Sequence, residues 1–284
     1  MTVRDILLAL ASYPEPTPDA SIDKALAFAS LLNAQVTGLA FETELRLMRP
    51  SDLLTRVLVD VPAMAAEESA RSKAHAARLM SCFEASATSQ RVRHEARVEH
   101  CDAFGVAAAL VEESKVHDLT VLPLQDAIGI EQWHAESVIF GSGRPVLLLP
   151  GPAHIRRSPS LDRITLAWDF SRPAARALAD ALPLMRQAGR VQIVMVENEK
   201  ELPARRTPER LLEHLMINGV AGKFEVVDAA GRRASELLRD YLDTTDATML
   251  VMGAFGHSRL REFVMGGTTR SMLDDPPLPV FLSH

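Results

Sequence analysis

Aromatic residues, cysteines and long apolar runs are scarce in this sequence, and each shortage removes a class of function. Aromatic residues make up 5% of the 284 residues, too few for a surface that stacks successive nucleic-acid bases. The two cysteines, Cys82 and Cys101, stand far apart without a CxxC spacing, so we interpret them as reduced and structural. No run of about 18 apolar residues is present, so no membrane partner is expected.

Positive charge is scarce as well. The chain has 31 Lys and Arg against 37 Asp and Glu, a formal net charge of −6. Nucleic acids and anionic membranes bind mainly to clustered Lys and Arg, so neither is an expected partner. A small anion is compatible with this balance, because backbone amides bind anions without net positive charge. The amino terminus enters a strand-like run without an apolar leader, so we expect a cytoplasmic protein.

The chain repeats one pattern of elements. A segment with several Pro and Arg at 150–160 divides it, which predicts domains at residues 1–150 and 160–284. Each half opens with a short apolar strand, then an amphipathic helix and a second strand, and ends with two further apolar strands separated by a helix. The paired strands are 6–10 and 164–168, 35–41 and 191–196, 119–122 and 249–252, and 145–149 and 279–282.

This alternation of buried strands and helices indicates parallel sheets covered on both faces. The predicted fold class is α/β, with two tandem doubly wound, Rossmann-like domains. The Ala-rich, helical region 60–89 of the first half has no counterpart of equal length in the second.

In such sheets ligands bind beyond the carboxyl ends of the strands. Asp169 follows the first strand of the second half, where its carboxylate can accept hydrogen bonds from an adenine amino group or from ribose hydroxyls. The alternative is a cap for the following helix, because Asp and Ser are preferred at that position. The residues leave both interpretations open.

Glycines follow the fourth strand of the second half. Gly253 and Gly256 come directly after it, and Gly266 and Gly267 precede a helix expected to start near Thr268 or Thr269. Glycines allow positive φ and a close approach to phosphate, and the helix-start amides and the two Thr hydroxyls can donate to its oxygens. The alternative is a loop with flexible turns.

This pattern resembles the nucleotide-binding members of the universal stress protein family, which carry G-x2-G-x9-G followed by Ser, Thr or Asn, and an Asp after the first strand. Gly253, Gly256 and Gly266 match that spacing, and Asp169 matches the acidic position. The resemblance extends over nearly the whole chain and implies the fold of the adenine-nucleotide α-hydrolases. One position departs from the pattern: Gly267 has no hydroxyl, which must then come from Thr268 or from a shift of the pattern by one residue.

The resemblance implies an adenine pocket near Asp169 and Val196, with Met252 and Gly253 beneath the ribose. The phosphates would then lie on Gly256, Gly266 and the residues after it. The implied ligand is ATP, or ADP or AMP, with Mg²⁺ as an accompanying ion. His257 and Arg259, more than Arg261, are candidates for contact with a γ-phosphate or with Mg²⁺-bound oxygens, and the alternative is an exposed loop face.

The first half lacks these features. Aligning the repeats places Ala11 where Asp169 stands and Pro123 where Gly253 stands. We therefore expect no nucleotide of the same kind there, and expect the first half to pair with the second as an internal pseudo-dimer. The metal-capable side chains at 94–102 fit no common ligand spacing and are interpreted as a polar edge strand.

Two functions follow. The first is a regulatory stress-response protein that binds an adenine nucleotide in its second half and needs no turnover, with a homodimer as a further option. The alternative is an interaction or dimerisation protein with a vestigial loop. An ATP-dependent enzyme is disfavoured because the residues after the strand at 164–168 contain neither a Ser-Gly-Gly-rich nor a His-x-Gly-His motif.

Overall fold

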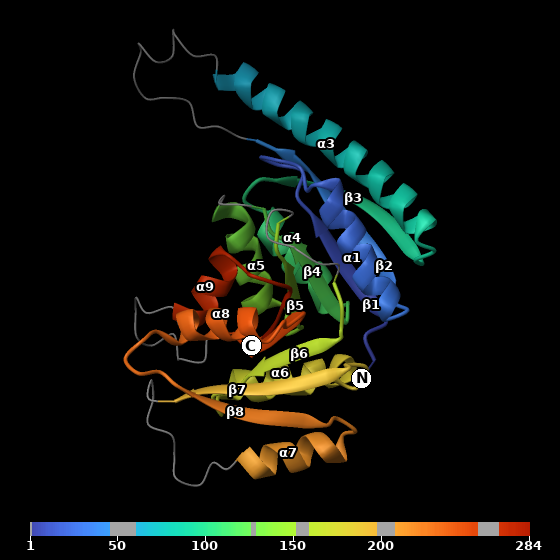
Figure 1. The fold of residues 1–284 in the computed structure, drawn as a ribbon. Helices are drawn as coiled ribbons and strands as arrows, with labels where there is room; N and C mark the ends of the chain where they lie inside the picture. The colour runs from blue at the N-terminus through green and yellow to red at the C-terminus, as the bar shows by residue number, and fades with distance from the viewer. Residues whose placement is uncertain (1, 46–60, 126–128, 152–158, 198–207, 255–266) are drawn as a thin grey trace.

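The computed structural model describes residues 2–45, 61–125, 129–151, 159–197, 208–254 and 267–284, drawn in colour in Figure 1. The strands of the first half are β1 (Asp5–Leu10), β2 (Gln35–Glu44), β3 (His94–Asp102), β4 (Leu119–Pro123) and β5 (Val146–Leu149). Its helices are α1 (Asp19–Leu31), α3 (Val61–Ser89), α4 (Val106–Lys115) and α5 (Gly129–Gly141).

The second half repeats this order. Its strands are β6 (Arg163–Ala167), β7 (Arg190–Glu197), β8 (Gly222–Asp228), β9 (Met249–Gly253) and β10 (Val280–Ser283). Its helices are α6 (Arg172–Met185), α7 (Pro208–Ile217), α8 (Ala234–Thr244) and α9 (Gly267–Asp274). The α3 helix has 29 residues and its counterpart α7 has 10, which confirms the predicted inequality.

The ten strands form one sheet in the order β3-β2-β1-β4-β5-β10-β9-β6-β7-β8. Each half therefore has the same doubly wound arrangement, and its strands are parallel, which confirms the predicted fold class. The halves join where β10 pairs antiparallel with β5, with Phe281 opposite Leu147. The two halves thus share one continuous sheet.

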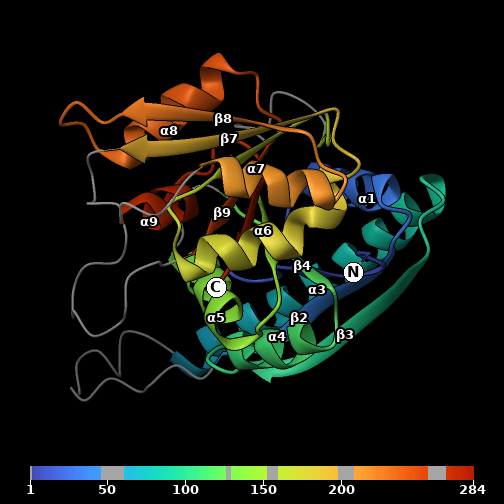
Figure 2. The same ribbon diagram turned by 90° about the horizontal axis from the view of Figure 1, so that it is seen from below.

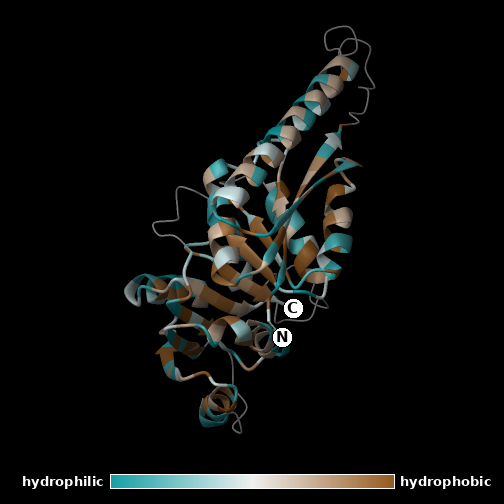
Figure 3. Cartoon of the chain, turned by 90° about the vertical axis from the view of Figure 1, so that its right-hand side faces the viewer, coloured by the Kyte–Doolittle hydropathy of each residue, from teal (hydrophilic) through white to brown (hydrophobic). Residues whose placement is uncertain are grey.

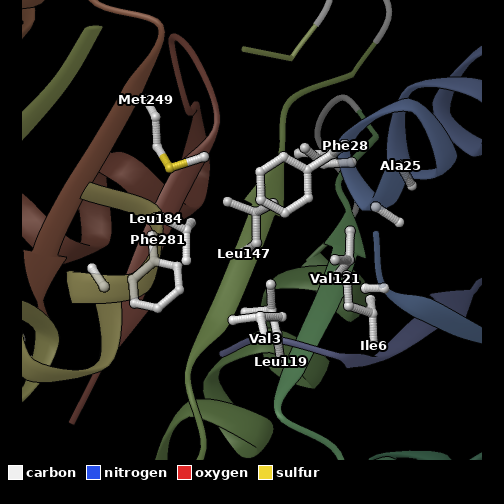
Figure 4. Packing of buried hydrophobic residues seen from close by; sticks show 14 of the residues in the cluster. Val3, Ile6, Ala25, Phe28, Leu119, Val121, Leu147, Leu184, Met249 and Phe281 are labelled. Carbon is white, nitrogen blue, oxygen red and sulfur yellow. The ribbon is translucent and has the colours of Figure 1, made fainter. Parts of the chain in front are cut away.

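Helices cover both faces of this sheet. One face is covered by α1, α3, α6 and α7, of which the last two lie side by side in Figure 2, and the other by α4, α5, α8 and α9. Hydrophobic residues concentrate in the central strands (Figure 3), as expected for strands buried on both faces. Figure 4 shows Leu147 of β5 between Phe28 of the first half and Phe281 and Leu184 of the second, so the core is continuous across the junction.

The position of β3 at one edge of the sheet confirms the interpretation of residues 94–102 as a polar edge strand. Alternate side chains of β3 are exposed, and Arg97 pairs with Glu95 and Glu113. Charges along an unpaired edge discourage strand addition from another chain. No helix among the described residues is long and apolar enough to cross a bilayer.

Candidate functional site

Strand register brings three of the predicted site residues to one edge of the sheet. Ala167 of β6 lies opposite Val194 of β7 and Met252 of β9. Asp169 is two residues beyond Ala167, Val196 is two beyond Val194, and Gly253 directly follows Met252. All of them therefore lie at the carboxyl ends of parallel strands, where doubly wound sheets bind ligands.

Asp169 sits in a tight turn between β6 and α6. Its Oδ1 accepts a hydrogen bond from the Ser171 amide at 2.9 Å. The cap of α6 is Ser171 instead, whose hydroxyl accepts from the Ala174 amide at 3.2 Å. Capping is thus done by Ser171, and the half-buried Asp169 carboxylate stands at the strand end beside it.

The turn is strained at the next residue. Phe170 has a φ of 58°, in the left-handed region that a bulky side chain seldom occupies. Its ring packs edge-on against Trp168, with centroids 5.5 Å apart. Trp168 is 9% exposed, and its indole Nε1 is buried without a hydrogen-bond partner. Backbone strain held by packing clusters at ligand-binding sites, which makes this turn part of the candidate site.

Gly253 serves a purpose other than the expected one. Its φ is not positive, so Gly253 does not use the left-handed conformation that glycine allows. A Cβ atom on Gly253 would overlap the backbone nitrogen of Ala174 and the carbonyl carbon of Pro173 in the first turn of α6. Glycine is therefore required here because the helix start packs directly on the strand end.

The second glycine group leads into α9 as expected, since this helix begins at Gly267. Gly267 is exposed, Thr268 is half-buried and Thr269 is 4% exposed. The first-turn amides of a helix have no intrahelical acceptor and carry the positive end of its dipole. The buried position of Thr269 leaves Thr268 as the more accessible hydroxyl. Gly256, His257, Arg259, Arg261 and Gly266 lie outside the described residues.

Arg239 fixes α9 against α8. Its guanidinium donates to the Ser271 carbonyl at 2.8 Å, to the Asp275 carboxylate at 2.9 Å and also to the Asp275 carbonyl. On the other side Arg270 pairs with Glu136 of α5 at 3.0 Å and with Asp274 at 2.8 Å. Arg239 could not be predicted from the sequence, because its partners are more than 30 residues away.

The same register shows what occupies this edge in the first half. Leu7 pairs with Thr120, which faces the first residue of β5. Thr165 pairs in the same way with Leu250, which faces the first residue of β10. Leu7 and Thr165 therefore hold equivalent places in the two halves. Counting from these pairs places Ala11 at the position of Asp169 and Pro123 at that of Gly253. The predicted absence of both residues from the first half is confirmed.

Comparison with known proteins agrees with this geometry. Residues 160–284 match the model of the universal stress protein family. A search of curated proteins finds no match. Among solved structures, a universal stress protein from Archaeoglobus fulgidus DSM 4304 shares 17% identity, with 98% of this chain and 95% of that chain covered and a TM-score of 0.68.

Two further structures cover the chain. A putative universal stress protein from Pseudomonas aeruginosa UCBPP-PA14 has 14% identity, coverage of 99% and 93%, and a TM-score of 0.54. The cytoplasmic domain of a prokaryotic cation chloride cotransporter has 11% identity, coverage of 99% and 95%, and a TM-score of 0.52. These likenesses show the fold of the whole chain, while the family model covers its second half. Residues 160–284 therefore match the universal stress protein family, and the whole chain has the fold of the solved universal stress proteins that it resembles.

Proposed function

We propose that the second half binds ATP or a related adenine nucleotide at the carboxyl ends of β6, β7 and β9, and that the chain is a regulatory stress-response protein. One observation carries this proposal: the register gathers Asp169, Val196 and Gly253 at the edge where α9 begins. A carboxylate and an apolar side chain therefore stand at the ends of neighbouring strands, and β9 leads along the chain to the helix α9.

Each part suits one part of the nucleotide. The Asp169 carboxylate accepts hydrogen bonds from ribose hydroxyls or from the adenine amino group, and the half-buried Val196 offers an apolar contact to the base. The α9 amides from Gly267 onward donate to phosphate oxygens. A Mg²⁺ ion would be held mainly by the phosphates and water, as is usual for this cation.

Binding without turnover is sufficient for this role. A ligand shifts the equilibrium between two conformations of a protein only if it binds one of them more tightly, so regulation requires differential affinity and no chemical step. The segment after β6 runs from Trp168 to Ser171. It contains neither a histidine that could act as a general base nor a glycine-rich pyrophosphate loop. We therefore propose a nucleotide-binding regulator whose role requires no turnover, with slow ATP hydrolysis or autophosphorylation as the most that we would expect.

Thermal unfolding with ATP, ADP and AMP tests the proposal. A ligand that binds only the folded state stabilises it by RT ln(1 + [L]/Kd), about 2.7 kcal/mol at a hundredfold excess over Kd. We expect the melting temperature to rise with millimolar nucleotide, and native mass spectrometry to give one nucleotide per chain. An unmoved melting temperature with all three nucleotides would favour an interaction protein with a vestigial loop.

Two variants locate the site. Asp169→Ala is expected to weaken nucleotide binding about tenfold, which corresponds to about 1.4 kcal/mol. Gly266→Val is expected to abolish binding, because its side chain blocks the phosphate. Asp102→Ala is a matched control, because Asp102 also ends a strand and accepts from the amide two residues on, at 3.0 Å, but in the first half. Binding that survives both site variants would place the nucleotide elsewhere.

A further inference from the structure

Equivalent residues of the two halves meet at the junction of the sheet. The first residues of β5 and β10, Val146 and Val280, hold the same position in their halves. The next residue of β5, Leu147, therefore corresponds to Phe281, and these two counterparts pair with each other across the junction (Figure 4). An antiparallel pair of equivalent residues lies on a twofold axis. The halves are thus related by a pseudo-twofold axis that passes between Leu147 and Phe281.

A second pair of equivalent residues meets on the helices beside this axis. Glu136 of α5 and Arg270 of α9 are 134 positions apart. The two strand residues on the axis have the same separation, so Glu136 and Arg270 are also counterparts. The Arg270 guanidinium donates to the Glu136 carboxylate at 3.0 Å, and the helices α5 and α9 are in contact. Equivalent residues touch only near a twofold axis, so this ion pair lies beside the pseudo-twofold axis as well.

The strand contact and the helix contact differ in what they can discriminate. The paired strand residues are all apolar and buried: Val146, Leu147, Leu148, Val280, Phe281 and Leu282. Either strand could therefore pair with a second copy of itself without bringing like charges together. The helix contact is different. Two first halves would bring two Glu136 carboxylates together, and two second halves would bring two Arg270 guanidinia together.

We propose that the Glu136–Arg270 pair determines which halves of this protein pair with one another. It favours the pairing of a first half with a second half and disfavours the pairing of two first halves or two second halves from different chains. The partner that fits the surface of α9 and β10 is thus a half with a carboxylate at the position of Glu136. Specific interfaces combine an attraction for the right partner with a repulsion of the wrong one. This selection does not depend on nucleotide binding.

The exposure of the pair suits the selection of a partner. The Glu136 side chain is 21% exposed and the Arg270 side chain 41%, and a single exposed ion pair adds little to stability. A change from opposite to like charges has a larger effect, because the attraction is lost and a repulsion is added. Asp274 of the same helix binds the Arg270 guanidinium at 2.8 Å. The pair therefore contributes more to the choice of partner than to the stability of the fold.

Charge reversals in the full chain reproduce the disfavoured pairings. Glu136→Arg brings two guanidinia together, as two second halves would, and Arg270→Glu brings two carboxylates together, as two first halves would. We expect each reversal to lower the folding equilibrium constant, measured by urea unfolding, at least fivefold, the equivalent of about 1 kcal/mol. A value within twofold of the wild type for either variant would overturn the proposal.

The double reversal separates this pair from other effects. Arg270→Glu also loses the contact with Asp274, so Glu136→Arg is measured in both backgrounds. In the Arg270→Glu chain it restores an opposite-charge pair, and we expect it to raise the folding equilibrium constant at least fivefold. The same direction of change in both backgrounds would overturn the proposal.

Glu112→Arg is the matched control. Glu112 lies on α4 of the same half and pairs there with Lys115 at 2.6 Å. Its reversal is expected to change the folding equilibrium constant by the same small factor whether residue 270 is Arg or Glu. A change of sign at Glu112 would show a general effect of net charge and would count against a contact between Glu136 and Arg270.

Refolding the two single variants together tests the choice of partner. Each variant alone has like charges at the axis in every pairing, whereas a Glu136→Arg chain and an Arg270→Glu chain can exchange halves and form two opposite-charge pairs. Tagged Glu136→Arg is refolded from urea with an untagged chain and captured by its tag. We expect it to retain at least tenfold more untagged Arg270→Glu than untagged Glu136→Arg. Equal retention of the two untagged chains would overturn the proposal.

Discussion

The two ligand-binding edges of this molecule share a backbone and differ in chemistry. Strand order and register are the same in both halves, so Asp169 and Ala11, and Gly253 and Pro123, occupy equivalent places. One edge presents a carboxylate and a helix start, and the other presents mainly apolar side chains and a neutral histidine. A duplicated fold can thus keep its architecture while a few strand-end residues set what each copy can bind.

The largest loss of stability is expected from a substitution at Gly253, where the two edges are packed most differently. Gly253→Ala places a Cβ against the backbone of Pro173 and Ala174, so the start of α6 has to move. We expect the free energy of unfolding to fall by about 3 kcal/mol, at the upper end of overpacking effects, and nucleotide binding to fall with it. Urea unfolding measures the change.

Gly267→Ala is the matched control for that substitution. A Cβ at Gly267 meets no atom within 4 Å, so the same chemical change is expected to leave stability within about 0.5 kcal/mol of the wild type. Equal effects of the two substitutions would show that the packing of α6 on β9 does not restrict the residue at 253.

An intermediate effect on stability is expected when the pH is lowered, because His134 of the first half is buried as a neutral side chain. Burial lowers the pKa of His134 to about 4 from an unfolded value near 6.5, so between these values the unfolded chain binds more protons than the folded one. Stability from this group is therefore complete above about pH 6.5 and is lost as the pH falls toward 4. The loss between pH 7.5 and 5 is at most about 2 kcal/mol.

Urea unfolding at pH 7.5 and pH 5 measures this term when wild type and His134→Leu are compared. Other titrating groups contribute to both proteins and cancel in the difference. We expect the variant to lose about 2 kcal/mol less than the wild type over this interval. Identical losses would mean that His134 titrates normally in the folded chain.

Much of the fold could be predicted from the sequence because its signals are local. The apolar runs at 164–168 and 249–252 correspond to β6 and β9, and the glycine pair at 266–267 correctly indicated the start of α9. The antiparallel pairing of β5 with β10 is not encoded in either strand, because Val146 to Leu149 are equally compatible with a parallel neighbour. Such pairings depend on contacts between residues more than a hundred positions apart.

The candidate site was only partly predictable, for a similar reason. Asp169 and Gly253 could be selected by position, yet the requirement for glycine at 253 arises from Pro173 and Ala174, whose contact with it exists only in the folded chain. The ion pair at the junction of the halves could not be predicted either, because its two members are 134 positions apart. Only the pairing of β5 with β10 makes them neighbours.

The smallest effect on stability is expected at the position where this chain departs from the family pattern. Gly267→Ser restores the hydroxyl that nucleotide-binding universal stress proteins usually carry there, and the open space around Gly267 accommodates it. Stability should stay within about 0.5 kcal/mol of the wild type. If phosphates lie at the start of α9, the new donor should tighten ATP binding about fivefold, or about 1 kcal/mol, as measured by calorimetry. Gly267→Ala separates the hydroxyl from the Cβ: an equal gain with alanine would rule out a hydrogen bond from residue 267, and no gain with serine would place the phosphates away from this helix start.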